Sequence, residues 1–177
     1  MTVMDRPAPG ELALIERFMN TANLEEGTDE FGDPASATAW LDAAGLTNAA
    51  LAEPERERLV TFRETLRELL LANHGGAPDP AAVAALNGSA RLVVAFDADG
   101  SARLEPADGG VDGVIAGLLG IVARSQAEGT WSRLKACPAT TCRWAFYDHS
   151  RNHSRTWCTM SLCGNREKAR NYRARQR

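Results

Sequence analysis

The chain has 177 residues, of which 44% are hydrophobic and 24% are charged, and its formal net charge at pH 7 is −3. This length and apolar content predict one folded domain with a small appendage and exclude a wholly disordered chain. The start of the sequence lacks the basic and apolar regions of a signal peptide, and no apolar run is long enough to span a bilayer. We therefore expect a cytoplasmic protein with no membrane partner.

Helical patterns dominate the first 130 residues. Glu11–Asn20 carries four apolar side chains on one face, as in an amphipathic helix. A second helix is expected over Pro34–Ala44, because proline fits a first helical turn and the following glycine fits a helix end. The longest helix is expected over about Ala52–Asn73, where leucine and phenylalanine recur at helical spacing. The apolar face of the first helix consists of Leu12, Ile15, Phe18 and Met19.

Shorter elements complete this half of the chain. We predict an acidic loop over Asn23–Asp33 and a short helix over Ala81–Asn87. A β-hairpin is expected from Arg91–Phe96 and Ala102–Glu105, followed by a last helix over Gly113–Glu128. Gly129 then marks the expected boundary between a helical domain, residues 1–130, and a C-terminal module, residues 131–177. The fold class expected is mainly α with a small β-hairpin.

Catalytic motifs are not found in the helical half. It contains no glycine-rich phosphate loop, no Gly-x-Ser-x-Gly and no His-Glu-x-x-His. Its one histidine, His74, stands at the end of the longest predicted helix and is better explained as a helix-terminal polar group than as a catalyst. We expect the protein not to be an enzyme.

The charge is divided unevenly along the chain. Residues 131–177 contain eleven lysines and arginines against two acidic residues, a formal charge of +9, whereas residues 1–130 have nine basic and twenty-one acidic residues, a charge of −12. A basic terminal segment suggests a polyanionic partner. The charge division also gives the hypothesis that the acidic half folds back on the basic segment and weakens nucleic-acid binding until a signal separates them.

All four cysteines lie in the basic segment, as two pairs with four residues inside each pair and fifteen between the pairs. Closed tetrahedral zinc sites use such paired soft ligands, and clustered cysteines in a reducing cytosol are more often metal ligands than disulfides. We expect one structural Zn²⁺ bound by Cys137, Cys142, Cys158 and Cys163. Because so short a segment has little apolar area, metal binding should supply much of its folding free energy.

Two other interpretations of the four cysteines remain open. The four thiols also allow two disulfides, in three possible connectivities. His149 and His153 could replace one cysteine pair in a mixed site, although too few residues separate them from Cys142 for a Cys2His2 finger.

The zinc module is expected to combine a hairpin with a terminal helix. The residues between the cysteine pairs are long enough for a β-hairpin, with Trp144, Phe146 and Tyr147 as strand residues. A helix could begin at Cys163-Gly164, which gives a treble-clef-like zinc finger. The zinc site would be formally −2, and Arg143 and Arg166 could offset this charge.

Basic residues are then expected to share one face of the terminal helix. At 100° per residue, four arginines form a narrow stripe, and like charges so close repel one another unless an anion relieves the cost. Arginine forks bind phosphates bidentately. The candidate nucleic-acid contacts are Arg151, Asn152, Arg155, Arg166, Lys168, Arg170, Arg173 and Arg177.

The run Trp157–Arg166, which reads WCTMSLCGNR, resembles the signature of the CGNR zinc-finger family. The similarity covers about Leu134–Arg177, although His149 and Thr156 differ from the usual family residues. Upstream, Phe18-Met19-Asn20-Thr21 and Trp40-Leu41 are similar to the ABATE domain that usually precedes this finger. The resemblance implies a bacterial, mostly helical protein of a family regarded as stress-induced transcription regulators, with zinc on the four cysteines and DNA binding by the finger.

The leading hypothesis is a DNA-binding transcriptional regulator. Its helical domain would sense a small-molecule signal, form a homodimer or contact the transcription machinery. One alternative is a zinc-stabilised module that binds protein or RNA. Another is a zinc-thiolate redox sensor, in which oxidation ejects the metal.

Overall fold

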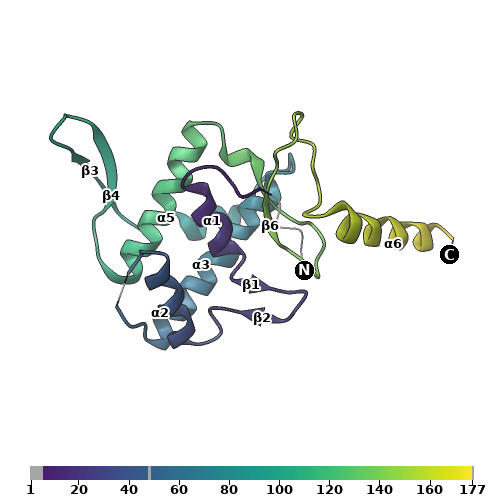
Figure 1. Ribbon diagram of the computed structural model, residues 1–177, viewed down its shortest axis with the longest axis horizontal. Helices are drawn as coiled ribbons and strands as arrows, with labels where there is room; N and C mark the ends of the chain where they lie inside the picture. Colours follow the sequence, from purple (N-terminus) through teal and green to yellow (C-terminus); the bar gives the residue numbers. More distant parts are fainter. Residues whose placement is uncertain (1–5, 48, 177) are drawn as a thin grey trace.

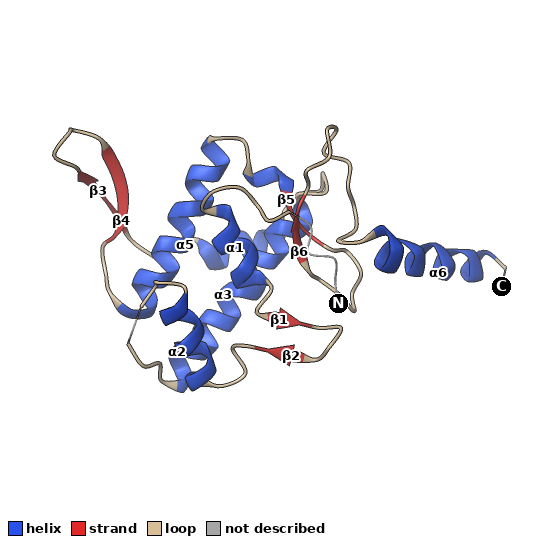
Figure 2. Cartoon of the chain, viewed as in Figure 1, coloured by secondary structure: helices blue, strands red, loops and turns tan. Residues whose placement is uncertain are grey.

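The computed structural model describes residues 6–47 and 49–176 (Figure 1). Helices form its main body, and three two-stranded antiparallel sheets lie around them (Figure 2). The mainly α fold class predicted from the sequence is confirmed. The helices are α1 (Leu12–Met19), α2 (Pro34–Ala43), α3 (Glu53–Ala72), α4 (Pro80–Leu86), α5 (Gly110–Ala127) and α6 (Asn165–Arg175). None of the helices in the described residues is long and apolar enough to cross a membrane.

The three sheets are short hairpins. They pair β1 (Ala22–Asn23) with β2 (Thr28–Asp29), β3 (Leu92–Phe96) with β4 (Ala102–Pro106), and β5 (Leu134–Ala136) with β6 (Ala145–Tyr147). The second confirms the predicted hairpin. The first was missed, because only two residues of each strand pair within an otherwise acidic loop. A 3₁₀ turn (Trp131–Arg133) precedes β5, and a π-helical turn (Met160–Gly164) leads into α6.

The sequence positions the helix ends as expected. The side chain of Asp33 caps α2 by accepting hydrogen bonds from the backbone N–H groups of Ala35 and Ser36, both at 2.9 Å. Gly45 follows α2 with a φ of 70°, a left-handed conformation that favours glycine. At the start of α3, Glu55 accepts a hydrogen bond from the backbone of Ala52 at 2.8 Å.

One hydrophobic core extends through both halves of the chain. The four predicted residues of α1 are all buried, and α1, α3 and α5 pack together at the centre of the molecule (Figure 1). The C-terminal segment contributes Trp131, Leu134 and Tyr147 to the same core. The helical body and the cysteine module therefore share buried apolar surface, which fixes their relative position.

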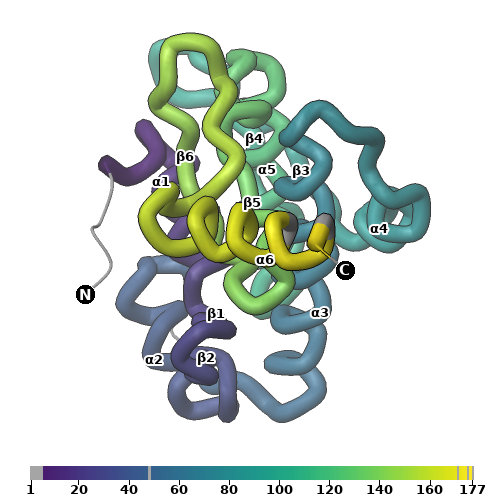
Figure 3. Tube along the Cα trace, turned by 90° about the vertical axis from the view of Figure 1, so that its right-hand side faces the viewer, coloured from purple at the N-terminus to yellow at the C-terminus, as the bar shows by residue number. Residues whose placement is uncertain are grey.

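Two elements extend from opposite ends of this body. The β3–β4 hairpin projects at one end and α6 at the other (Figure 1). Viewed from the α6 side, that helix crosses in front of the body, and the loop between β6 and α6 rises beside it (Figure 3). The basic terminal helix is thus presented to the outside and is not packed against the helical core.

Candidate metal centre and basic helix

The four cysteines come together in one buried cluster. Their sulfur atoms all lie within 4.8 Å of one another. The Sγ atom of Cys158 is 3.5 Å from that of Cys142 and 3.6 Å from that of Cys163. These separations exceed the roughly 2.05 Å of a disulfide bond. All four residues are free thiols in the structure, so the disulfide alternative is not adopted.

The first cysteine pair is held by a tight turn between β5 and β6. The N–H of Cys137 donates to the carbonyl of Trp144 at 2.8 Å, and the N–H of Cys142 donates to that of Ala139 at 2.9 Å. Arg143 closes the turn in a left-handed conformation with a φ of 54°. The hairpin therefore encloses the first pair. The prediction that the hairpin lies between the two cysteine pairs is wrong, because β6 pairs with Leu134–Ala136, which precedes Cys137 in the sequence.

The second pair lies where the terminal helix begins. Cys158 precedes the π-helical turn, Cys163 is inside it, and α6 starts two residues after Cys163. The predicted helix start at Cys163-Gly164 is thus confirmed. A Cβ atom at Gly164 would lie 2.4 Å from the sulfur of Met160, so a side chain there would require the flexible Met160 side chain to move.

The electrostatics of the cluster fit a divalent cation. Hydrogen bonds from Cys142 and Cys158 lower the pKa of Cys137 to about 2. The bond to that thiolate raises the pKa of Cys142 to about 12, and the same contacts raise the pKa of Cys158. Four neighbouring thiolates therefore cannot coexist without a compensating positive charge. Four converging soft donors are the set that zinc prefers, so these residues fit one Zn²⁺ ion.

The two histidines do not join the cluster. The ligand atoms that converge belong to cysteines alone among the described residues. His149 is 2.9 Å from the carbonyl of Arg6 through its Nε2 atom. His153 has a φ of 52° in the loop after β6 and offers its carbonyl to Lys135. Mixed cysteine and histidine ligation therefore receives no support from the geometry.

A buried ion pair organises the loop between the cysteine pairs. Lys135 in β5 and Asp148 after β6 approach to 2.8 Å, and both side chains are almost fully buried. Burial raises the pKa of Asp148, but hydrogen bonds from Lys135, Ser150 and Arg155 outweigh burial and hold it at about 2. Lys135 also donates to the carbonyls of His153 and Arg155. Lys135 was not among the residues singled out from the sequence, because no local pattern relates it to Asp148, 13 residues away.

Arg155 is half-buried and contacts the backbone of this module. Its guanidinium donates to the carbonyls of Trp157 and Cys158 and lies 4.9 Å from the centre of the Phe146 ring. This predicted nucleic-acid contact therefore also stabilises the backbone around Cys158, in the second cysteine pair. Arg143 also has a structural partner, because its side chain is 3.5 Å from Glu68 in α3.

The helical body binds the module through polar side chains. The side-chain amide of Asn20 donates to the carbonyl of Ala145 at 2.9 Å and accepts a hydrogen bond from the N–H of Ala145 at 2.8 Å. It thereby makes the two hydrogen bonds that the backbone of a neighbouring strand would make. At the end of α3, Asn73 donates to the carbonyls of Trp131 and Leu134.

Arg67 in α3 and His74, two residues after its end, extend this attachment. His74 contacts the carbonyl of Ala136 at 2.8 Å, in agreement with its interpretation as a helix-terminal polar group. The buried Arg67 donates to the carbonyl of Arg143 at 2.7 Å. Contacts on both sides of Cys137 and Cys142 therefore fix the metal centre to α3.

The terminal helix is exposed on nearly every side. Of the α6 side chains that can be described, only Glu167 is partly buried. Arg170 pairs with Glu167 at 2.7 Å, and Arg166 pairs with Glu25 of the β1–β2 loop at 2.6 Å. The other exposed candidate contacts are Lys168 and Arg173 in α6 and Arg151 and Asn152 in the loop before it; Arg177 is outside the described residues.

These observations define a mainly helical protein with a C-terminal four-cysteine metal-binding module. Residues 133–176 match the CGNR zinc finger, and residues 12–128 match ABATE, described as "Putative stress-induced transcription regulator". The chain therefore belongs to the ABATE family and carries a CGNR zinc finger. These two families are described as regulators and zinc fingers, not as enzymes. No curated protein gives a significant match.

Proposed function

We propose that the protein is a DNA-binding transcription regulator whose four cysteines hold one structural zinc ion. In this proposal residues 1–130 form the regulatory ABATE-like domain and residues 131–177 form the zinc finger. Zinc supplies a positive charge that neutralises the thiolates and joins the β5–β6 turn to the start of α6. The description of the matched families as a transcription regulator and a zinc finger supports this reading.

The projecting basic helix is the observation that carries the proposal. An isolated helix of 11 residues with polar side chains all round is not stable in water without a partner. Lys168, Arg170 and Arg173 are exposed on it, and Tyr172 is 66% exposed. Such a helix has the dimensions and charge to enter the major groove of duplex DNA, where phosphates flank it on both sides.

The loop before α6 adds to this surface. Arg151 and Asn152 are exposed at its tip, and the Lys135–Asp148 pair holds its base. Arg166 lies at the start of α6, where Glu25 competes for its guanidinium. Five cationic side chains, Arg151, Arg166, Lys168, Arg170 and Arg173, are thus placed to meet phosphates.

The salt dependence of DNA binding tests this assignment. If about five phosphates are neutralised, log K should fall against log salt concentration with a slope of about −4.5. Replacing Arg170 and Arg173 together by alanine should reduce the magnitude of that slope by about 1.8. Arg91→Ala, an exposed arginine on the opposite projecting hairpin, is the matched control and should leave the slope unchanged.

A salt response that the double variant leaves unaltered would contradict the role of α6. Competition with structured RNA and with duplex DNA at the same salt concentration separates the two nucleic acids. The proposal requires that duplex DNA competes better. Elemental analysis of the reduced protein should find one zinc per chain, and Cys158→Ser should lower that ratio.

A further inference from the structure

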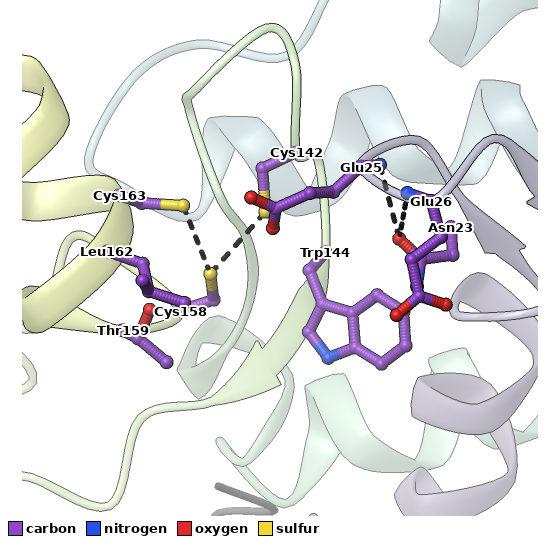
Figure 4. A pocket seen from close by; sticks show the side chains of 9 residues that line it. All are labelled: Asn23, Glu25, Glu26, Cys142, Trp144, Cys158, Thr159, Leu162 and Cys163. Carbon is purple, nitrogen blue, oxygen red and sulfur yellow. Dashed lines mark hydrogen bonds between the residues drawn. The ribbon is translucent and has the colours of Figure 1, made fainter. Parts of the chain in front are cut away.

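A cavity of about 200 Å³ opens beside the cysteine cluster (Figure 4). Cys142, Cys158 and Cys163 line it, whereas Cys137 does not. Trp144 and Leu162 form walls, and the carboxylates of the β1–β2 loop lie at its edge (Figure 4). The cluster is therefore covered by protein on the side of Cys137 and is accessible on the side of the other three sulfur atoms.

The cavity is larger than the metal site requires. An ion held among the four sulfur atoms takes only a small part of the volume, and one water molecule occupies about 30 Å³ in the liquid. Space for several molecules of that size remains next to three of the four sulfur atoms. A closed structural zinc site does not need such an approach path.

An unsatisfied hydroxyl group marks the same cavity. The Oγ1 atom of Thr159 is buried and is the only such side-chain oxygen or nitrogen in the described residues without a hydrogen-bond partner. Thr159 lines the cavity directly after Cys158 (Figure 4). Buried polar groups in folded proteins almost always have partners, so a water or another small polar molecule in the cavity would supply the one that this hydroxyl needs.

We propose that the cavity admits small neutral peroxides to Cys142, Cys158 and Cys163, and that their oxidation releases zinc and switches off nucleic-acid binding. Thr159 donates its hydrogen bond to the incoming peroxide oxygen and acts as a positioning residue. The inference concerns the metal site itself, and its regulatory consequence rests on the proposed function.

The oxidation takes two steps. A thiolate sulfur attacks one peroxide oxygen, the O–O bond breaks, and the leaving hydroxide takes up a proton to become water, which leaves a sulfenic acid. A neighbouring thiolate then attacks that sulfur, a disulfide bond forms, and the departing hydroxide becomes a second water. Two thiolates thus lose two electrons to one peroxide. The sulfur atom of Cys158 is 3.5 Å from that of Cys142 and 3.6 Å from that of Cys163, so an oxidised sulfur in the cavity has a neighbouring thiolate within reach.

Loss of these ligands has a direct effect on α6. Cys163 lies in the turn that starts this helix, and that turn is the main element against which α6 packs. Without the metal, the turn is no longer tied to the β5–β6 hairpin. The basic helix then loses its fixed position relative to Arg151 and the loop.

The test uses full-length, zinc-loaded protein treated with hydrogen peroxide. Zinc release is followed with a chromogenic chelator, and the first sulfenic acids, trapped with dimedone, are located by peptide mass spectrometry together with the disulfides that follow. We expect the first sulfenic acid to form on Cys142, Cys158 or Cys163, which line the cavity, and not on Cys137. A first sulfenic acid on Cys137 would overturn the proposal, and this measurement needs no variant.

Matched variants test the cavity and the hydroxyl separately. Leu162→Trp should fill the opening and slow zinc release about fivefold, whereas Val83→Trp on α4 should not. Thr159→Val should slow release about threefold, whereas Thr156→Val, at an exposed position, should have no effect. Equal rates in wild type, Leu162→Trp and Thr159→Val, each confirmed to hold one zinc, would overturn it.

DNA binding is measured in parallel on reduced and oxidised protein. Binding that is lost with zinc release supports the switch. Binding that persists after zinc release overturns it. If the reduced protein does not bind DNA, the proposed function fails, whereas the access of peroxide to the cysteines is still decided by zinc release and the location of the first sulfenic acids.

Discussion

The attachment of the zinc finger by Asn20 gives a prediction that can be worked from individual hydrogen bonds. Asn20 satisfies both the N–H and the carbonyl of Ala145, a residue that is 0% exposed. Asn20→Ala leaves both groups without a partner. Each buried unsatisfied group costs about 1–3 kcal/mol, so we expect the free energy of unfolding to fall by about 3 kcal/mol. For a chain of this size that corresponds to a decrease in Tm of about 6–12 °C.

Thermal unfolding of the zinc-loaded protein, followed by circular dichroism, measures this change. Asn87→Ala is the control, because Asn87 is exposed and follows α4. Zinc content is determined for both variants before unfolding, so that metal loss is not mistaken for a lost hydrogen bond. A decrease for Asn20→Ala no larger than that for Asn87→Ala would refute the strand-like role of this side chain.

Three further predictions concern other contacts. Glu25→Gln should raise DNA affinity about twofold to fivefold by freeing Arg166, whereas Glu26→Gln, with the same change in charge, should have less effect in the same titration. Asp29→Asn should lower the free energy of unfolding at pH 7 by about 2 kcal/mol, because it leaves the buried Arg63 without its bidentate partner. Burial raises the pKa of Asp29, but the bonds from Arg63 outweigh it, so the folded-state pKa lies below the ordinary value of 3.8. The wild-type advantage should therefore be complete above that value and should disappear in denaturant titrations as the pH falls through the lower pKa. Chelation of zinc should abolish DNA binding and reduce the ellipticity, whereas retained binding in the metal-free protein would contradict the structural role of the ion.

Local signals predicted most of the helical body. The apolar spacing of α1 and the helix-ending Gly45 were read correctly because they act within a few residues of the element that they define. The cysteine pairs were likewise found because metal ligands must recur at short spacing. The zinc cluster and the helix that follows it were therefore predictable from the sequence.

The missed features join residues that are distant in sequence. Asn20 and Ala145 are separated by 125 positions, and no periodicity relates an amide side chain to a backbone strand so far away. The pairing of β5 with β6 was missed because Leu134–Ala136 is only three residues long and has no alternation. Arg155 was assigned to nucleic acid because its charge is visible in the sequence, whereas its carbonyl partners are not.

The packing of the C-terminal module into the shared core also has a consequence for biosynthesis. Asn20, Arg67, Asn73 and His74 belong to helices or turns that leave the ribosome well before residues 131–176, to whose carbonyls they bind. Until those last residues emerge, the nascent helical bundle exposes the apolar surface that later covers Trp131 and Leu134. Completion of the hydrophobic core is therefore a late event. Translation that stops early leaves an intermediate with exposed apolar surface, which chaperones or proteases can recognise.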